Sequence, residues 1–215
     1  MEKIFKKYSL LEGPNVSRET FEDFEEFIEM IIKKNDKINL ISKETAKNEI
    51  IRHRHIIDSA QAIDFIDLNS NTTSDLGTGG GMPGIIMAII TKNLKKNMKI
   101  NLYEKSYHKS LFLKEVSRQL HLDTEVIQKD IFEMKDLSSG TIIARAFKPM
   151  PIVLDLVSKN FKTYQNLILF MGQNGKQILR DSLKDWDFEY KERKSVTNEN
   201  SFLLNIKNIK KKKLN

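Results

Sequence analysis

The residues best suited to chemistry lie in one glycine-rich segment, Asp75-Leu76-Gly77-Thr78-Gly79-Gly80-Gly81-Met82-Pro83-Gly84, which holds five of the nine glycines. Glycine lets a backbone turn sharply and approach a ligand closely because it has no Cβ. Pro83 suits the first turn of a helix, so the segment is expected to leave a strand and enter a helix. Free N–H groups at such a helix start attract polar or anionic groups. The segment therefore predicts a ligand-binding loop at the carboxyl ends of parallel strands.

Two interpretations of this loop follow from its residues. Gly79, Gly81 and Gly84 match the Gly-x-Gly-x-x-Gly fingerprint of dinucleotide sites, and Glu104 lies twenty residues beyond, where an acid binds a ribose. Asp75 favours a different ligand, since a carboxylate before the loop repels a pyrophosphate but can pair with an ammonium group. The spacing alone predicts a nucleotide-type ligand and leaves its identity open.

Further polar residues flank the loop in the sequence. Residues 52–55 (Arg-His-Arg-His) place four potential cations in one helical turn, and Arg54 and Asp58 are four residues apart and can pair. Arg145 is expected to end a strand at the ligand-bearing edge, where an arginine can contact phosphate, base or cofactor. Asn39 can hydrogen-bond a base edge or cap the turn after a long helix. Four histidines without any cysteine, and without helical metal-ligand spacing, predict no metal site.

The composition excludes several classes of protein. The 215 residues carry 36 Lys+Arg and 29 Asp+Glu, a formal charge of +7, and have no cysteine for disulfides, thiol nucleophiles or iron–sulfur clusters. The tail 207–215 holds five lysines and no acid, and without these lysines the charge falls from +7 to +2. A basic tail favours a polyanionic partner such as nucleic acid. No apolar run is long enough for a membrane span or a signal peptide, so we expect a cytoplasmic protein.

Two parts of the chain differ in pattern, and together they must position these residues. Residues 1–68 read as a helical extension, with one helix capped by Ser17 and another over about 46–68. Residues 69–206 alternate strands and helices, which implies a doubly wound, mostly parallel α/β sheet. The last two strands, 187–196 and 201–206, predict an antiparallel hairpin at the sheet edge. Parallel strands are expected over 73–77, 99–104, 124–128, 141–145 and 166–171, with helices over 83–91, 107–120, 150–160 and 175–183.

The string Asp-x-Gly-x-Gly-x-Gly after the first strand resembles motif I of the class I S-adenosylmethionine (SAM) methyltransferases. The resemblance implies a Rossmann-like, seven-stranded sheet that ends in such a hairpin, with SAM as the cofactor. By the same resemblance Glu104 would bind the ribose hydroxyls, and Asp130 would lie near the adenine. The cofactor residues implied are Asp75, Gly77, Gly79, Gly81, Met82, Glu104, Asp130, Ile131, Phe132 and Arg145.

Longer strings indicate a narrower family. Asn39-Leu40-Ile41-Ser42, Arg54-His55-Ile56-Ile57-Asp58-Ser59, the glycine loop and Arg145-Ala146-Phe147 occur in that order. They resemble the bacterial 16S rRNA guanine-N7 methyltransferases, also called the glucose-inhibited division protein B family, from about residue 39 to 206. This implies an enzyme that transfers the methyl group of SAM to N7 of a guanine in the 530-loop region of 16S rRNA. The catalytic residues implied are Asn39, His55 and Arg145.

The alternative within the same fold is a SAM-dependent enzyme acting on another RNA, a small molecule or a protein. For the main interpretation we expect 16S rRNA as the partner, within the 30S subunit or an assembly intermediate, and a monomeric enzyme. The chain departs from the family pattern at Met171 and Asn200, where the family usually has Lys and Arg, and at His108-Lys109, where it has a Lys-Arg pair. The lysine-rich tail is expected to compensate for these lost RNA contacts.

Overall fold

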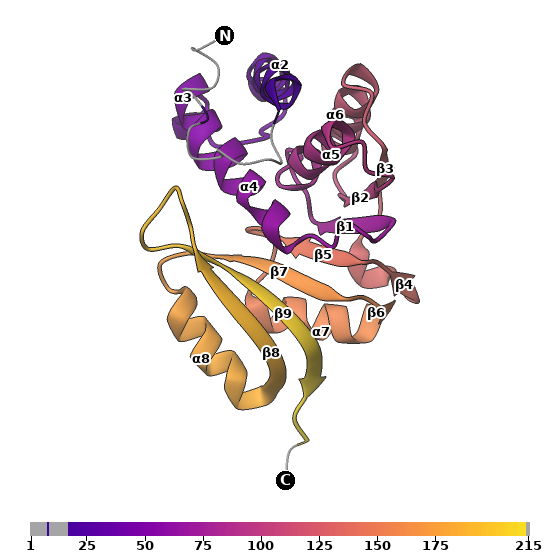
Figure 1. Ribbon diagram of the computed structural model, residues 1–215, viewed down its shortest axis with the longest axis vertical. Helices are drawn as coiled ribbons and strands as arrows, with labels where there is room; N and C mark the ends of the chain where they lie inside the picture. Colours follow the sequence, from indigo (N-terminus) through magenta and orange to yellow (C-terminus); the bar gives the residue numbers. More distant parts are fainter. Residues whose placement is uncertain (1–7, 9–16, 214–215) are drawn as a thin grey trace.

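The computed structural model describes residue 8 and residues 17–213 and is a three-layer α/β fold (Figure 1). Among these residues the central sheet has seven strands in the order β3-β2-β1-β5-β7-β9-β8. The first five strands of this order are parallel, whereas β9 runs antiparallel to β7 and β8 antiparallel to β9. The predicted doubly wound sheet with a terminal hairpin is confirmed. The strands are β1 (Thr72–Leu76), β2 (Lys99–Tyr103), β3 (Thr124–Ile127), β5 (Thr141–Ala144), β7 (Asn166–Met171), β8 (Trp186–Lys194) and β9 (Phe202–Lys211).

Helices cover both faces of this sheet (Figure 1). The inner parallel strands β5 and β7 are buried on both sides, so their apolar residues form runs instead of alternating with polar ones. In β5, for example, Ile142 packs in the core on the α7 side and its neighbour Ile143 packs in the core on the α5 side. The helices are α2 (Arg18–Asn35), α5 (Gly84–Asn93) and α6 (Tyr107–Gln119) on one face, and α7 (Met150–Asn160) and α8 (Gly175–Asp185) on the other.

Helix α2 begins where its sequence predicts. The Ser17 hydroxyl accepts the N–H of Thr20 at 3.4 Å and so satisfies one of the free donors of the first turn. Phe21 and Phe24 are buried on the face that packs towards the core. Tyr8 stacks on Phe21 with 4.6 Å between ring centroids, and its side chain is fully buried. The start of the chain therefore packs against the helical extension at this residue.

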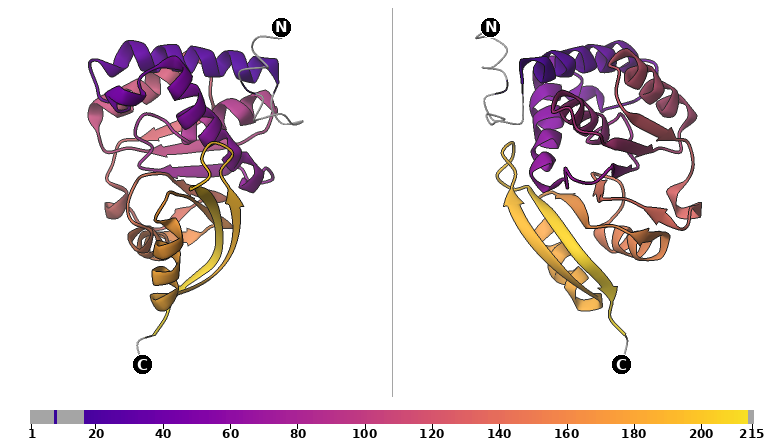
Figure 2. Two further views of the ribbon diagram at one scale, coloured as in Figure 1. Left: turned by 90° about the vertical axis from the view of Figure 1, so that its left-hand side faces the viewer. Right: turned by 45° about the vertical axis from the view of Figure 1, so that its right-hand side comes forward.

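The second predicted helix is a run of short helical segments instead of one regular helix (Figure 2). A π-helical turn occupies Arg52–Ile57, and π turns inside helices are frequent at functional sites. The irregular turn cannot be read from the apolar spacing that predicts a helix over 46–68. The segments are α3 (Asn48–Ile51), η3 (Arg52–Ile57), α4 (Asp58–Ala60) and η4 (Gln61–Phe65).

The terminal hairpin is longer than its sequence predicts. Strand β9 reaches Lys211 instead of ending at Ile206, and residues 207–211 pair with β8 instead of beginning a separate tail. A bulge explains the error, since Asn208 has a φ of +55° and Ile209 returns to the core after two exposed residues. Ile206 pairs with Leu167 near the start of β7. The lysines that follow Ile206 in β9 therefore lie beyond the amino end of β7.

A second, smaller sheet accompanies the central one. Strands β4 (Leu137–Ser138) and β6 (Phe161–Thr163) form a separate two-stranded sheet that is too short to leave a pattern in the sequence. In the part of the chain that the structure describes, no helix combines the length and the apolar character that a membrane crossing requires.

Candidate functional site

An open cavity of about 350 Å³ lies at the carboxyl ends of β1, β2, β3 and β5. This is the edge of the sheet where a doubly wound fold binds its ligand. Six of the ten predicted cofactor residues line the cavity and four do not. Those that line it are Gly77, Gly79, Glu104, Asp130, Ile131 and Phe132; those that do not are Asp75, Gly81, Met82 and Arg145.

The glycine loop forms one wall of this cavity. Gly77 and Gly79 have φ values of +66° and +59°, in the left-handed region that favours glycine. A Cβ on Gly77 would lie 2.1 Å from Cδ2 of Phe147, whereas a Cβ on Gly79 would meet nothing closer than 3.9 Å. Gly79 therefore presents bare backbone to the open cavity, while Gly77 makes room for an aromatic side chain that lines it.

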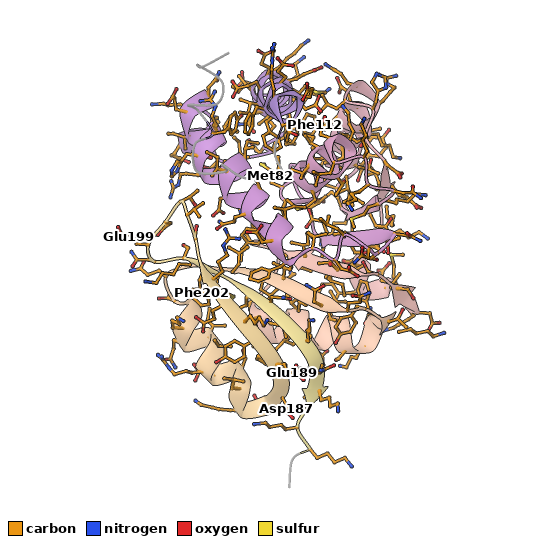
Figure 3. The ribbon with its side chains drawn as sticks, in the orientation of Figure 1. Met82, Phe112, Asp187, Glu189, Glu199 and Phe202 are labelled. Carbon is orange, nitrogen blue, oxygen red and sulfur yellow. The ribbon has the colours of Figure 1, made fainter. Side chains whose placement is uncertain are left out.

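Asp75 and Met82 support the loop from below instead of facing the cavity. Asp75 is 1% exposed, and its Oδ2 accepts the N–H of Gly84 at 2.8 Å. Burial raises the pKa of the Asp75 carboxyl to about 6. Met82 is buried in the core between the helical run and α5 (Figure 3). These two residues thus hold the loop in shape in this structure.

Glu104 follows the last residue of β2 and ties the glycine loop to the end of that strand. Its Oε2 accepts the N–H of Gly79 at 3.0 Å, and its Oε1 accepts the N–H of Ser106 at 2.7 Å. The carboxylate is largely buried, yet it lines the cavity. A carboxylate has about four acceptor positions, and the two backbone bonds leave capacity for two more donors. Glu104 is therefore placed to accept hydroxyl groups of a ligand.

The far wall of the cavity is aromatic and follows β3. Asp130 caps a short 3₁₀ turn by accepting the N–H of Phe132 at 3.1 Å. Ile131 is buried, whereas the Phe132 ring is 39% exposed and stacks on Phe147 with 6.0 Å between centroids. An apolar slot beside a carboxylate suits a flat heteroaromatic ring.

A second cavity of about 320 Å³ adjoins the first, and Ala146 lines both. Arg145 lines this second cavity and not the first. Its guanidinium lies 5.7 Å from the centre of the Phe170 ring. Phe202, at the start of β9, forms another part of the wall (Figure 3). A ligand in one cavity and a flat ring in the other would meet at Ala146.

Asp58 holds Arg145, a pairing that the sequence does not reveal. The spacing predicts an Arg54–Asp58 pair, and this is wrong. Instead, Nη2 of Arg145 lies 3.0 Å from Asp58 Oδ2 and donates to the backbone oxygen of Arg54 at 2.7 Å. Asp58 Oδ1 also accepts the hydroxyls of Ser195 and Thr197, from the turn of the hairpin, at 3.1 and 2.8 Å. Asp58 thus joins the helical run, β5 and the hairpin turn beside the second cavity.

His55 lies beside this network and is neutral at physiological pH. Both of its ring nitrogens are buried, and neither has a hydrogen-bond partner among the described residues. Burial lowers the pKa of His55 to about 4, and the positive charge of Arg145 adds to this effect. A buried polar ring without partners is costly, and His55 lines neither cavity in this arrangement.

Asn39 is exposed and does not cap the turn after α2. Asn35 does so, because its Oδ1 accepts the N–H groups of Leu40 and Ile41, each at 2.9 Å. The turn still reaches the site, since the backbone oxygen of Leu40 lies 3.0 Å from where a Cβ on Gly80 would be. Asn39 therefore sits next to the glycine loop with its side chain free for solvent or a ligand.

Four lysines also line the first cavity. Apart from Lys109, the sequence does not single them out, because lysine is abundant throughout the chain. Met171 lines the second cavity, and Asn200 lies in the hairpin turn, where its N–H donates to Asn198 Oδ1. The residues that replace two family cations are thus near the site but supply no charge. The four lysines of the first cavity are Lys105, Lys109, Lys129 and Lys148.

The comparison with protein families identifies relatives along nearly the whole chain. The family model GidB, described as rRNA small subunit methyltransferase G, matches residues 20–206. A protein of Pelagibacter ubique named ribosomal RNA small subunit methyltransferase G is 62% identical over 99% of this chain and 100% of its own length. A Ruegeria pomeroyi protein of the same name is 32% identical over 91% of this chain and 94% of its own.

Solved structures support the fold. A SAM-dependent methyltransferase from Aquifex aeolicus superposes with a TM-score of 0.53 and 13% identity, over 70% of this chain and 89% of that one. The structure titled MtNAS in complex with MTA and tNA gives a TM-score of 0.58 at 13% identity, over 86% of this chain and 70% of that one. At such low identity the likeness concerns the fold alone.

Proposed function

The chain belongs to the family of rRNA small subunit methyltransferase G, and from this we propose that its first cavity binds SAM while a guanine of 16S rRNA enters the second. Family membership makes the chain a SAM-dependent rRNA methyltransferase that acts on guanine N7, and the dinucleotide interpretation of its glycine loop is wrong. The observation that carries the proposal is the meeting of the two cavities at Ala146. The first cavity is lined by the glycine loop and Glu104, which suit a nucleotide-type ligand, and the second is lined by Arg145.

The residues of the first cavity fit the cofactor. Its volume lies in the usual range for small-molecule sites. Glu104 would accept the ribose hydroxyls with its two remaining acceptor positions, and Phe132 and Ile131 would cover the adenine next to Asp130. The bare backbone of Gly79 allows close approach of the amino-acid portion. Bound SAM supplies an electrophilic methyl group on a positively charged sulfur. Asp75 acts through the loop, since its Oδ2 holds Gly84.

The second cavity suits the acceptor base. Guanine N7 carries a free lone pair at neutral pH and attacks the methyl group without losing a proton, so no general base is required. The chain's task is then alignment, which can contribute ~7–11 kcal/mol in favourable cases. Phe170 and Phe202 offer apolar walls, and the base must leave its stack to enter, as other base-modifying enzymes require.

Arg145 and His55 would position the RNA without touching N7. Methylation places a positive charge on the base, so a cation at N7 would oppose the reaction. Arg145 uses Nη2 for Asp58 and Arg54, which leaves its other N–H groups for guanine O6 or a phosphate. Neutral His55 can hydrogen-bond the base or the loop backbone without adding charge. Asn39, exposed beside the glycine loop, would contact a neighbouring base edge.

The natural substrate is 16S rRNA within the 30S subunit or an assembly intermediate, and the enzyme acts in the cytoplasm as a monomer. The decisive test supplies methyl-labelled SAM together with 16S rRNA, free and in 30S particles from cells that lack this methylation. Label is then mapped to a nucleotide. Label at N7 of the 530-loop guanine is the expected result. Binding of SAM without label in either RNA form would contradict the substrate assignment and favour another RNA, a small molecule or a protein.

A further inference from the structure

We infer that a lysine groove along α7 docks the phosphates of rRNA outside the target nucleotide. This surface, the α7 groove, is a hollow of about 770 Å³ between α7, the end of α8 and the end of β9. The proposed function assigns it no role. The inference rests on that function, because it takes rRNA as the substrate. The lysines of the groove are Lys159, Lys184, Lys211, Lys212 and Lys213.

The groove has an excess of positive charge. Five lysines face two carboxylates, Asp155 and Asp185, among the residues that line it. Lys159 pairs with Asp155 at 2.7 Å, and Lys184 pairs with Asp181 at 2.7 Å. None of the three lysines at the end of the chain pairs with a carboxylate within the described residues. Their charge is therefore available to an external anion.

Two of these terminal lysines, Lys211 and Lys212, are held in place by the fold. The backbone N–H of Lys212 donates to Asp185 O at 2.9 Å, and its Nζ donates to Leu183 O at 2.8 Å. The Nζ of Lys211 lies 5.6 Å from the centre of the Trp186 ring, a cation–π contact. The sequence predicts a basic tail after residue 206, whereas the structure has Lys211 at the end of β9 and Lys212 bonded to the end of α8. Fixed cations lose less conformational entropy when they bind.

The groove starts close to the first cavity and leads away from it. Pro151 lines the groove and follows Lys148 of the cavity by three residues. Helix α7 spans eleven residues, about 16 Å at 1.5 Å per residue. The tail lysines lie beyond it at the open end of the hairpin, where Asp187 is seen far from Glu199 of the turn (Figure 3). An RNA strand laid along α7 would therefore run from the side of the first cavity to these lysines.

RNA is the occupant that these features favour. The surface is a hollow, so it fits a strand better than a flat membrane. Ile152 is 43% exposed in the groove and offers an apolar contact for a ribose or a base. The proposed substrate is itself a polyanion, and its binding site lies near one end of α7, a helix about 16 Å long. A contact this far from the reacting base would help only RNAs that extend beyond the 530 loop.

The test is a double charge reversal, Lys211→Glu with Lys213→Glu, against a matched control, Lys96→Glu with Lys114→Glu. The control lysines are exposed, lie on the α5–α6 side of the sheet and have no carboxylate partner within the described residues. Both variants change the charge equally. Binding and methyl transfer are measured for full 16S rRNA or 30S particles and for a short stem-loop that carries only the 530 loop, from 50 to 300 mM salt. Thermal unfolding verifies that both variants are folded.

The groove variant should weaken binding of the long RNA at least about tenfold at 100 mM salt and lower the salt slope by about 1.4, since each phosphate contact contributes ~0.7. Its KM for 30S particles should rise with kcat unchanged. The variant should bind the stem-loop with the same affinity as the wild type does. Equal losses in the control variant, or equal losses on the stem-loop, would overturn the inference. Unchanged RNA binding with lost adhesion to anionic lipid vesicles would assign the groove to a membrane instead. Failure of the wild type to methylate any RNA would refute the proposed function, while the binding comparison would still test the groove.

Discussion

Replacement of His55 by glutamine should change how the stability of the protein depends on pH. The folded pKa of His55 is about 4 and its unfolded value is 6.5. Between these values the unfolded state binds the proton and the folded state does not, so folding stability falls as the pH falls. The difference corresponds to ~3.4 kcal/mol, and because His55 is half-buried we expect about 2 kcal/mol after solvent screening. His55→Gln should remove this loss, at little cost near pH 7, because both ring nitrogens are unpartnered.

Asp75 acts in the opposite direction over almost the same range. Its folded pKa is about 6 against 3.8 in the unfolded chain, so the folded state binds the proton first and gains stability as the pH falls, by ~3 kcal/mol. In the wild type the two effects oppose each other between pH 6 and pH 4. The His55 variant should therefore gain stability on acidification relative to the wild type, and an Asp75→Asn variant should lose it.

Urea unfolding of the wild type and both variants at half-unit steps from pH 7 to pH 4 measures these differences. At each pH, the free energy of unfolding of each variant is subtracted from that of the wild type. The difference removes the contribution of the other carboxylates, which titrate in the same range. A wild-type minus His55→Gln difference that stays constant across this range would refute the reasoning, as would an NMR titration of His55 near 6.5. Both would mean that water reaches the ring nitrogens.

Three further predictions concern the site. Arg145→Ala should lower kcat at least about 100-fold with SAM affinity nearly unchanged; near-wild-type transfer would remove Arg145 from the site. Glu104→Ala should weaken SAM binding about tenfold or more by calorimetry and leave RNA binding unaltered, and the reverse pattern would contradict the ribose assignment. Gly77→Ala and Gly79→Ala share the same backbone strain of about 1–2 kcal/mol, but only Gly77→Ala collides with Phe147. Gly77→Ala should therefore lose SAM affinity much more than its neighbour does, and equal losses would mean that Phe147 does not shape the cavity.

Local patterns predicted most of the fold. Helix α2 follows from Ser17 and the apolar spacing after it, and each parallel strand matches its expected range to within a residue or two at either end. The glycine loop and Glu104 were found because their chemistry depends on residues adjacent in sequence or at a fixed spacing. These features rest on propensity and periodicity, which a single sequence carries.

The rest depends on contacts between distant parts of the chain. Asp58 contacts Ser195, 137 residues later in the chain, and pairs with Arg145. Helical spacing relates Asp58 only to nearby residues and therefore predicts Arg54 as its partner. The bulge at Asn208 breaks the alternation that marks a strand, and five lysines of β9 and its end were read as a tail. The roles of Asp75 and Met82 show the same limit, since a motif indicates which residues matter without indicating which of them face the ligand.

The distribution of charge over the two cavities matches the chemistry of methyl transfer to a neutral base. Beside the second cavity Asp58 compensates Arg145, and His55 is uncharged, so a guanine bound there as we propose would meet little net positive charge opposing the charge that methylation creates. Further lysines line the first cavity and the α7 groove, and among the described residues Lys109, Lys129 and Lys148 of the cavity and Lys211, Lys212 and Lys213 of the groove have no carboxylate partner.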